Sequence, residues 1–157
     1  MTRSLDEIDV NLLHELQVDA DRPNVELARL VGLSPAATMN RVRRLKESGV
    51  LRRVTARLDS SAAGFPLQVY ILVTLARHED SAAKRFRDTV EALPNVIAAD
   101  EVTGDVDAVL MVVARDVAEL QQVLAKLASR GGATRLVTLL RLGELKPSAP
   151  LPLAAAS

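Results

Sequence analysis

The stretch NVELARLVGLSPAATMNRVRRLKESGVL, residues 24–51, decides how the first part of the chain folds. Apolar residues at helical spacing fill its beginning, Gly32-Leu33 interrupts them, and a second helical pattern runs on to Gly49. Asn24 can cap the first of these helices and Ser34 the second. Pro35 suits the first position of the second helix, where a missing N–H costs nothing. Gly49 marks its end. The stretch therefore predicts a helix, a tight turn and a second helix.

The second predicted helix has two different flanks. At roughly 100° per residue, Met39, Val42 and Leu45 fall on one flank, which we expect to pack inward with Thr38 beside it. On the other flank, small side chains can approach base edges and arginines can hold phosphates, which a helix in the DNA major groove requires. The predicted DNA-binding residues are Ser34, Pro35, Ala36, Ala37, Asn40, Arg41, Arg43, Arg44 and Arg53.

The distribution of charge supports this hypothesis although the formal net charge is zero. Acids outnumber bases over residues 1–26, whereas between Arg41 and Arg57 the bases face a single acid, Glu47. Such a cluster can also be an ordinary solvated helix face, but the preceding turn and cap and the following basic segment favour DNA. Aromatic residues make up only 2% of the chain, which argues against stacking on unpaired bases and favours double-stranded DNA.

Upstream of this stretch, Ser4-Leu5-Asp6-Glu7 resembles a capping box, and a helical apolar pattern follows to about Asp19. Residues 1–51 thus form a predicted three-helix, winged-helix-like DNA-binding domain. Downstream, an alternating pattern over residues 50–58 predicts a strand, and Asp59 to Pro66 has the composition of a hinge. We assign residues 52–66 to strand and linker.

Residues 67–146 predict a second domain with the order β-α-β-β-α-β, the ferredoxin-like arrangement, so the fold class is α+β. The expected elements are strands 67–76, 96–103, 108–114 and 134–145, and helices 81–93 and from Asp116 to Gly131-Gly132. Because the strand 108–114 is apolar on both sides, we expect an exposed sheet face that a second copy covers in a homodimer. The proline-rich tail, residues 147–157, cannot continue the sheet and is expected to be mobile or to lie along a partner.

Several classes of protein are excluded by what the 157-residue sequence lacks. It has no cysteine, no signal peptide and no apolar run long enough to span a bilayer, so we expect a cytoplasmic protein without membrane partners. No nucleophile–base pair, metal constellation or phosphate loop is found, so we expect no catalytic residue, metal or cofactor. His14 fits an exposed helix position, and His78, beside Arg77, fits a loop.

Taken together, the motifs resemble the Lrp/AsnC family, the feast/famine transcriptional regulators, over nearly the whole chain. The matching stretches are Leu5-Asp6-Glu7-Ile8-Asp9 with Leu12-Leu13, Asn24-Val25-Glu26-Leu27-Ala28, Val31-Gly32-Leu33-Ser34-Pro35, Arg41-Val42-Arg43-Arg44-Leu45 with Gly49, and Gly104-Asp105-Val106-Asp107. The resemblance implies a DNA-binding domain linked to an amino-acid-responsive domain. It also implies dimers that pair through the strand after the recognition helix, and higher assemblies, often octamers.

The resemblance places an amino-acid effector between dimers, near the turn between the second and third strands of the second domain. The implied effector residues are Val102, Thr103, Gly104, Asp105, Asp107, Thr134 and Thr138. A zwitterion needs an acceptor for its ammonium, which Asp107 can supply, and N–H donors for its carboxylate, which a glycine turn exposes. The simpler alternative is a hairpin turn followed by a solvated aspartate.

The chain also departs from the family pattern. Residues 129–133, Ser-Arg-Gly-Gly-Ala, replace the usual leucine-proline-glycine-valine run before the last strand. Two alternative functions remain at this stage: an enzyme resembling the sirohaem decarboxylases, which share the two-domain fold, and an amino-acid-binding module that has lost DNA affinity. The two histidines offer little for the first alternative, and the arginines argue against the second.

Overall fold

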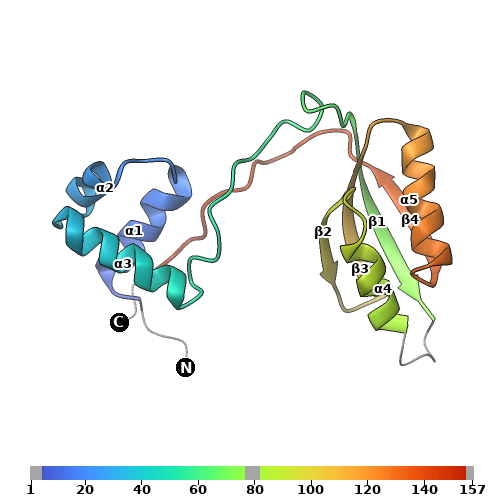
Figure 1. The fold of residues 1–157 in the computed structure, drawn as a ribbon, viewed down its shortest axis with the longest axis horizontal. Coiled ribbons are helices and arrows are strands. Elements are labelled where there is room, and N and C mark those ends of the chain that lie inside the picture. Colours follow the sequence, from blue (N-terminus) through green and yellow to red (C-terminus); the bar gives the residue numbers. More distant parts are fainter. Residues whose placement is uncertain (1–4, 77–81, 155–157) are drawn as a thin grey trace. The chain divides into compact units, whose positions relative to one another are not determined.

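A computed structural model describes residues 5–76 and 82–154, and Figure 1 shows its helices and strands. The chain divides into two compact units. We call Met1–Ala56 together with Lys146–Ser157 the helical unit, and Arg57–Leu145 the sheet unit. The elements are α1 (Glu7–Val18), α2 (Asn24–Val31), α3 (Pro35–Glu47), β1 (Leu67–Leu75), α4 (Ala82–Glu91), β2 (Val96–Glu101), β3 (Ala108–Ala114), α5 (Val117–Ser129) and β4 (Ala133–Leu140).

The helical unit contains the three predicted helices, with two caps that differ from expectation. The Asp6 carboxylate caps α1 by accepting from the Asp9 N–H at 2.8 Å, so this helix begins later than the Ser4 box suggested, and Ser4 lies outside the described residues. Asn24 does not cap α2, because its side chain donates to the Pro35 carbonyl at 2.9 Å. In α3 the Ser34 hydroxyl accepts from the Ala37 N–H at 3.2 Å, as predicted.

A small apolar core holds these helices together. Four leucines are buried in it: Leu12, Leu13, Leu27 and Leu45. Partly buried side chains surround them, and one of these, Leu153, comes from the tail that follows the sheet unit. Burying a leucine side chain contributes about 1.5–3 kcal/mol, so a core of this size leaves little surplus after the entropy of ordering three helices.

The sheet unit has the predicted β-α-β-β-α-β order, with an antiparallel sheet in the order β2-β3-β1-β4. Helices α4 and α5 cover one face (Figure 1). The last strand ends at Leu140, sooner than predicted, because Leu140 pairs with Val69 near the start of β1 and little of β1 remains to pair with. Ten buried residues form the core under the helices: Val69, Ile71, Val73, Phe86, Leu93, Ala108, Leu110, Val112, Val123 and Leu127.

The opposite face of the sheet is apolar and no described element covers it. Tyr70 lies at its centre, paired with Met111 of β3 and Leu139 of β4. Tyr70 is 36% exposed and Leu139 is 47% exposed. A sheet with one face packed and one open normally alternates apolar and polar residues, and this one does not. The open face is therefore suited to contact with another apolar surface.

Two segments outside the regular elements differ from the sequence prediction. Residues 50–58 were predicted as a strand, but this part of the described chain is not assigned as one. A strand needs a partner for its N–H and C=O groups, and none of the residues that the structure describes supplies one here. The tail, which was expected to be mobile or to lie along a partner, packs with the helical unit of its own chain.

Candidate functional site: the outer face of α3 and the β2–β3 turn

The inner face of α3 is centred on Thr38 rather than on Met39. Thr38 is fully buried, and its hydroxyl donates to the Ser34 carbonyl at 3.1 Å. Leu45 is also buried, as predicted, but Met39 is 59% exposed, so its expected inward position was wrong. A satisfied hydroxyl can be buried at small cost, which hydropathy alone does not reveal. Met39 therefore lies on the exposed part of the helix.

The outer face of α3 presents polar and basic side chains to solvent. Asn40, Arg43 and Arg44 are all exposed. The Asn40 side-chain oxygen accepts from Arg43 Nη2 at 3.0 Å, and Arg43 Nε lies 3.8 Å from Glu47. Arg44 forms no ion pair with any described residue. The beginning of the same helix has small side chains: Ser34, Pro35 and Ala36 are exposed, and Ala37 is half-buried. Small side chains here allow another molecule to approach the helix closely.

Arg41 has a different place from the other arginines. Its Nη1 donates to Asp6 at 2.7 Å and to Asp9 at 2.8 Å, both at the beginning of α1. The Arg41 hydrogen bond lowers the pKa of the Asp6 carboxyl, and the two carboxylates raise the pKa of Arg41. Its guanidinium thus ties α3 to α1, a role the sequence pattern did not indicate.

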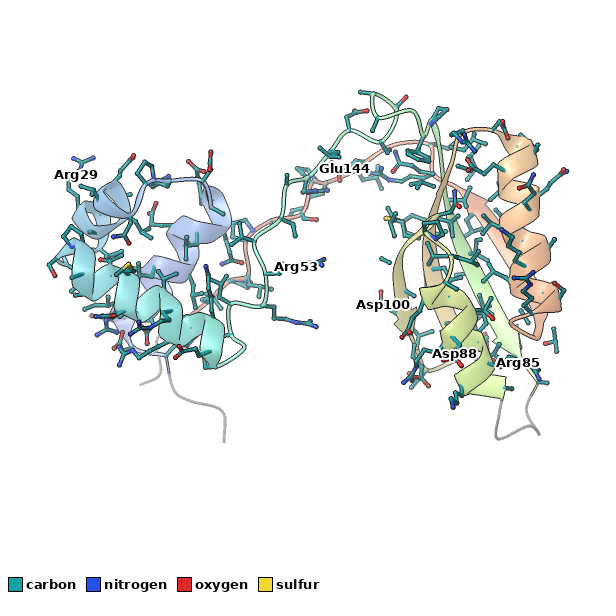
Figure 2. All side chains as sticks on the ribbon, viewed as in Figure 1. Arg29, Arg53, Arg85, Asp88, Asp100 and Glu144 are labelled. Atoms are coloured by element: carbon teal, nitrogen blue, oxygen red, sulfur yellow. The ribbon has the colours of Figure 1, made fainter. Side chains whose placement is uncertain are left out.

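Arg53, the remaining predicted DNA contact, lies on the extended segment after α3 (Figure 2). It is exposed, as are its neighbours Arg52 and Val54. The backbone leaves α3 through a turn in which the Leu51 N–H donates to the Leu45 carbonyl at 2.9 Å, and Gly49 adopts a positive φ of 77°. Arg53 is therefore carried past the C-terminal end of α3 rather than on its outer face.

In the sheet unit, the predicted effector residues 102–107 form the turn between β2 and β3. The Val102 N–H donates to the Asp107 carbonyl at 3.1 Å, and Gly104 has a φ of 124°, which favours glycine. Thr103 and Asp105 are exposed. The turn is thus a closed hairpin connection with its outer side open to solvent.

Asp107 is not simply solvated. Its Oδ2 accepts the Leu75 N–H at 2.7 Å, at the position where the pairing of β1 with β4 shifts register. On the other side of the same β1 residues, the Thr134 hydroxyl donates to the Thr74 carbonyl at 3.0 Å. The structure therefore brings Asp107 and Thr134 to one end of β1. Thr138 lies further along β4, opposite Ile71.

A cavity of about 150 Å³ lies beside Asp107, between α4 and strands β2 and β3. Its apolar lining includes Phe86, Val90 and Leu110. Its polar lining includes Arg87, Asp100, Glu101 and Asp107. Arg87 Nη2 lies 3.9 Å from Glu101 Oε2. The helical spacing of Phe86 and Val90 predicts the inner face of α4, but nothing in the sequence indicates that they leave space there.

The unusual Gly131-Gly132 pair has a steric explanation. Gly132 has a φ of 71°, which residues with a side chain rarely adopt, and a Cβ at this position would also displace the guanidinium of Arg85. Arg85 and Asp88 belong to α4 (Figure 2). A Cβ at Gly131 would meet the Leu127 carbonyl. The departure from the family pattern at residues 129–133 therefore coincides with close packing of α4 on this turn.

Within the described residues, no helix is long and apolar enough to cross a membrane, and no group of histidine, cysteine, aspartate or glutamate is arranged to hold a metal ion. His14 is an exposed residue of α1, 3.9 Å from Glu15. His78 lies outside the described residues.

Two family models match most of the chain: an AsnC-type helix-turn-helix domain over residues 5–46 and an Lrp/AsnC ligand binding domain over residues 68–151. A leucine-responsive regulatory protein of Rhizobium meliloti is 36% identical over 143 residues, covering 90% of this chain and 92% of that protein. A glutamate uptake regulatory protein of Zymomonas mobilis is 32% identical over 153 residues, covering 98% and 93%.

Solved structures agree with these matches. A transcriptional regulator from Neisseria meningitidis in complex with L-methionine has a TM-score of 0.87 at 30% identity, covering 95% of this chain and 97% of its own. A feast or famine regulatory protein from M. tuberculosis, complexed with L-methionine, has a TM-score of 0.83 at 29% identity, covering 92% and 96%. The likeness extends over both units.

Proposed function

The chain belongs to the Lrp/AsnC family of DNA-binding transcriptional regulators, and from this premise we propose that α3 is its recognition helix and that an amino acid controls it through the sheet unit. The protein is a regulator and not an enzyme, so the sirohaem decarboxylase alternative is dropped. The observation that carries the DNA-binding proposal is the outer face of α3, where Asn40, Arg43 and Arg44 are exposed above a buried inner face.

We assign separate tasks to the residues of this face. The small residues at the start of α3, together with Asn40, are placed to read base edges in the major groove, while Arg43 and Arg44 contact phosphates. Arg53 adds a phosphate contact beyond the end of α3. Met39, which the sequence placed inward, offers an apolar contact on the exposed side. Arg41 contributes by positioning α3 against α1.

A gel shift on the promoter DNA upstream of the protein's own gene tests this assignment. Arg44→Ala should weaken binding across sequences and reduce the slope of log affinity against log salt by about 0.9, the value for one lost phosphate contact. Arg130→Ala, which removes an exposed arginine at the C-cap of α5, is the matched control and should leave affinity and slope unchanged. Undiminished binding by Arg44→Ala, or equal effects of both variants, would refute the assignment. Failure of the unaltered protein to bind any promoter DNA would favour a module that has lost DNA affinity.

For the effector, we propose an amino acid bound at the β2–β3 turn. The two structural neighbours in complex with L-methionine support this class of ligand. The turn around Gly104 offers N–H groups for a carboxylate, and Asp107 offers a carboxylate for an ammonium. The adjacent cavity of about 150 Å³ has the size and apolar lining to take an aliphatic or thioether side chain. On this hypothesis Asp107 has two tasks, holding the Leu75 N–H with one oxygen and the ligand with the other.

Thermal shift across the twenty amino acids, beginning with L-methionine, tests the site. A ligand present at 100 times its Kd should stabilise the protein by about 2.7 kcal/mol. Asp107→Asn keeps an oxygen acceptor for Leu75 but removes the charge, so it should abolish the ligand-induced shift while leaving the ligand-free Tm nearly unchanged. Asp88→Asn, the same change at an exposed position of α4 outside the predicted effector residues, is the control. No shift with any amino acid would contradict the proposal.

We further propose that the protein works in the cytoplasm as a homodimer that assembles further, to an octamer. The open apolar face around Tyr70 supports face-to-face pairing, and residues 50–58 can gain their missing strand partner from a second copy. Light scattering after gel filtration measures the assembly. Met111→Glu should shift it toward monomer, and an unaltered mass would contradict pairing through this face.

A further inference from the structure

The helical unit includes the proline-rich tail, which belongs neither to the proposed DNA-binding face nor to the proposed effector site. The tail leaves the sheet unit at Leu145 and packs with residues 1–56. The Leu151 N–H donates to the side-chain oxygen of Gln17, near the end of α1, at 2.7 Å. Leu153 packs against the cluster of buried leucines in the core of the helical unit. One polar and one apolar contact therefore fix the same short segment.

The tail forms one wall of a groove whose other walls are the end of α1 and the segment that follows α3. Apolar side chains dominate its lining: Leu13, Leu16, Val18, Val50, Leu51 and Val54, together with Leu151 and Leu153 of the tail. Leu13 belongs to the buried core itself, so Leu153 extends that core outward. Without the tail, apolar surface connected to the core would face solvent.

Two prolines restrict the conformation of the tail before it docks. Pro150 and Pro152 fix their φ angles and hold the preceding residues, Ala149 and Leu151, in extended conformations. The Leu153 N–H donates to the Leu151 carbonyl at 2.9 Å, a three-residue turn whose central residue is Pro152. Because a proline-rich segment has little conformational freedom to lose, docking it costs less entropy than docking an ordinary chain.

We propose that residues 150–153 are a strap that docks on the helical unit of the same chain and is required for its stability and hence for DNA binding. The strap gives the helical unit a second connection to the sheet unit, through β4, in addition to the connection through residues 57–66. The segment that docks is this chain's own tail. The contact itself does not depend on the proposed effector site or on the proposed DNA contacts; only its effect on DNA binding rests on the proposed function.

Hydrogen exchange of the full-length protein tests the strap. Leu153→Asp places a charge in the apolar groove, and amides of α1 around Leu13 to Val18 should exchange about tenfold faster. Promoter affinity should fall by a similar factor. The matched control is Leu145→Asp, because Leu145 is fully exposed and the change is chemically identical. Unchanged α1 exchange in Leu153→Asp, or an equal increase in both variants, would overturn the proposal even if DNA binding by the unaltered protein were never detected.

A cross-link distinguishes a strap in the same chain from one supplied by a second copy. The sequence has no cysteine, so Val18→Cys with Leu151→Cys introduces the only two thiols. Both positions line the groove, both side chains are largely exposed, and the backbone N–H of residue 151 is retained for Gln17. A short bis-maleimide should give a product with the mobility of a single chain on denaturing gels. Products of double mass, or no reaction above that of either single variant, would overturn the assignment.

Discussion

The helical unit and the sheet unit hold themselves together in different ways. The sheet unit buries ten residues in one core under α4 and α5, whereas the helical unit buries four leucines. The helical unit adds ties between its elements: Arg41 bonds Asp6 and Asp9, and Arg22 bonds Glu15 at 2.7 Å. Polar links and Leu153 of the tail add to the stability of the small helical core. Substitutions at single residues should therefore destabilise the helical unit more than the sheet unit.

Matched core truncations should give the largest effects and separate the two units. Leu12 and Leu110 are both fully buried, one in each core, and either leucine replaced by alanine should cost about 2–5 kcal/mol. We expect Leu12→Ala to unfold the helical unit at room temperature while the sheet unit stays protected, and Leu110→Ala to leave a folded but weakened sheet. Hydrogen exchange resolved by segment measures this. Simultaneous loss of protection in both units would mean that they unfold as one.

The tie between α1 and α3 should have the next largest effect. Arg41→Ala removes two charged hydrogen bonds, one of them to an exposed carboxylate, and should cost the helical unit about 1–2 kcal/mol. Because Arg41 acts by positioning α3, its variant should bind promoter DNA more weakly with an unchanged salt slope. A reduced slope, as expected for Arg44→Ala, would assign Arg41 to a phosphate instead.

Acid should weaken the helical unit through the same tie, by a smaller amount. The pKa of Asp6 is lowered from its ordinary value of 3.8 by Arg41, so the stabilisation is complete above that value and is lost as pH falls through the lowered one. Denaturant unfolding followed in α1 should therefore show a decline below about pH 4. The decline should be shallower in Asp6→Asn, and equal slopes would remove Asp6 from the explanation.

The corresponding ion pair of the sheet unit should have the smallest effect. Arg115 lies just before the N-cap of α5 and Glu119 lies in its first turn, with Arg115 Nη2 3.0 Å from the carboxylate. The hydrogen bonds from Arg115 lower the pKa of Glu119 to about 2. Arg115→Ala should return that pKa toward 4.5, measured by NMR titration, yet leave Tm within experimental error, since solvent screens the pair. A Tm loss as large as that of Arg41→Ala would contradict the contrast between the two units.

Local signals explain most of what the sequence predicted correctly. Ser34-Pro35 begins α3, Gly32 ends α2 in a left-handed conformation, and Asp116 caps α5. Runs rich in β-branched and other apolar residues located β1 and β3. Each of these depends on residues within one helical turn or one strand, so a single sequence contains the information.

The features that the sequence did not reveal involve partners distant along the chain, or a polar group whose hydrogen bond allows it to be buried. Arg41 meets carboxylates more than thirty residues away, and Asp107 meets Leu75 across the sheet. Thr38 is buried because its hydroxyl finds a backbone carbonyl, which displaced Met39 from the predicted inner face. The strand expected at residues 50–58 has no partner strand among the described residues of the chain. The assignments of Arg43, Arg44 and the β2–β3 turn to ligands remain predictions.

The place of the tail has a consequence for how the protein is made. Residues 150–153 are synthesised after all of β1 to β4, yet they pack on the first three helices. The helices can form as soon as they leave the ribosome, but their groove stays open until the strap emerges. A newly made chain should therefore pass through a stage in which its sheet is complete and its DNA-binding helices are not. A nonsense mutation after residue 146 would leave the chain permanently at that stage.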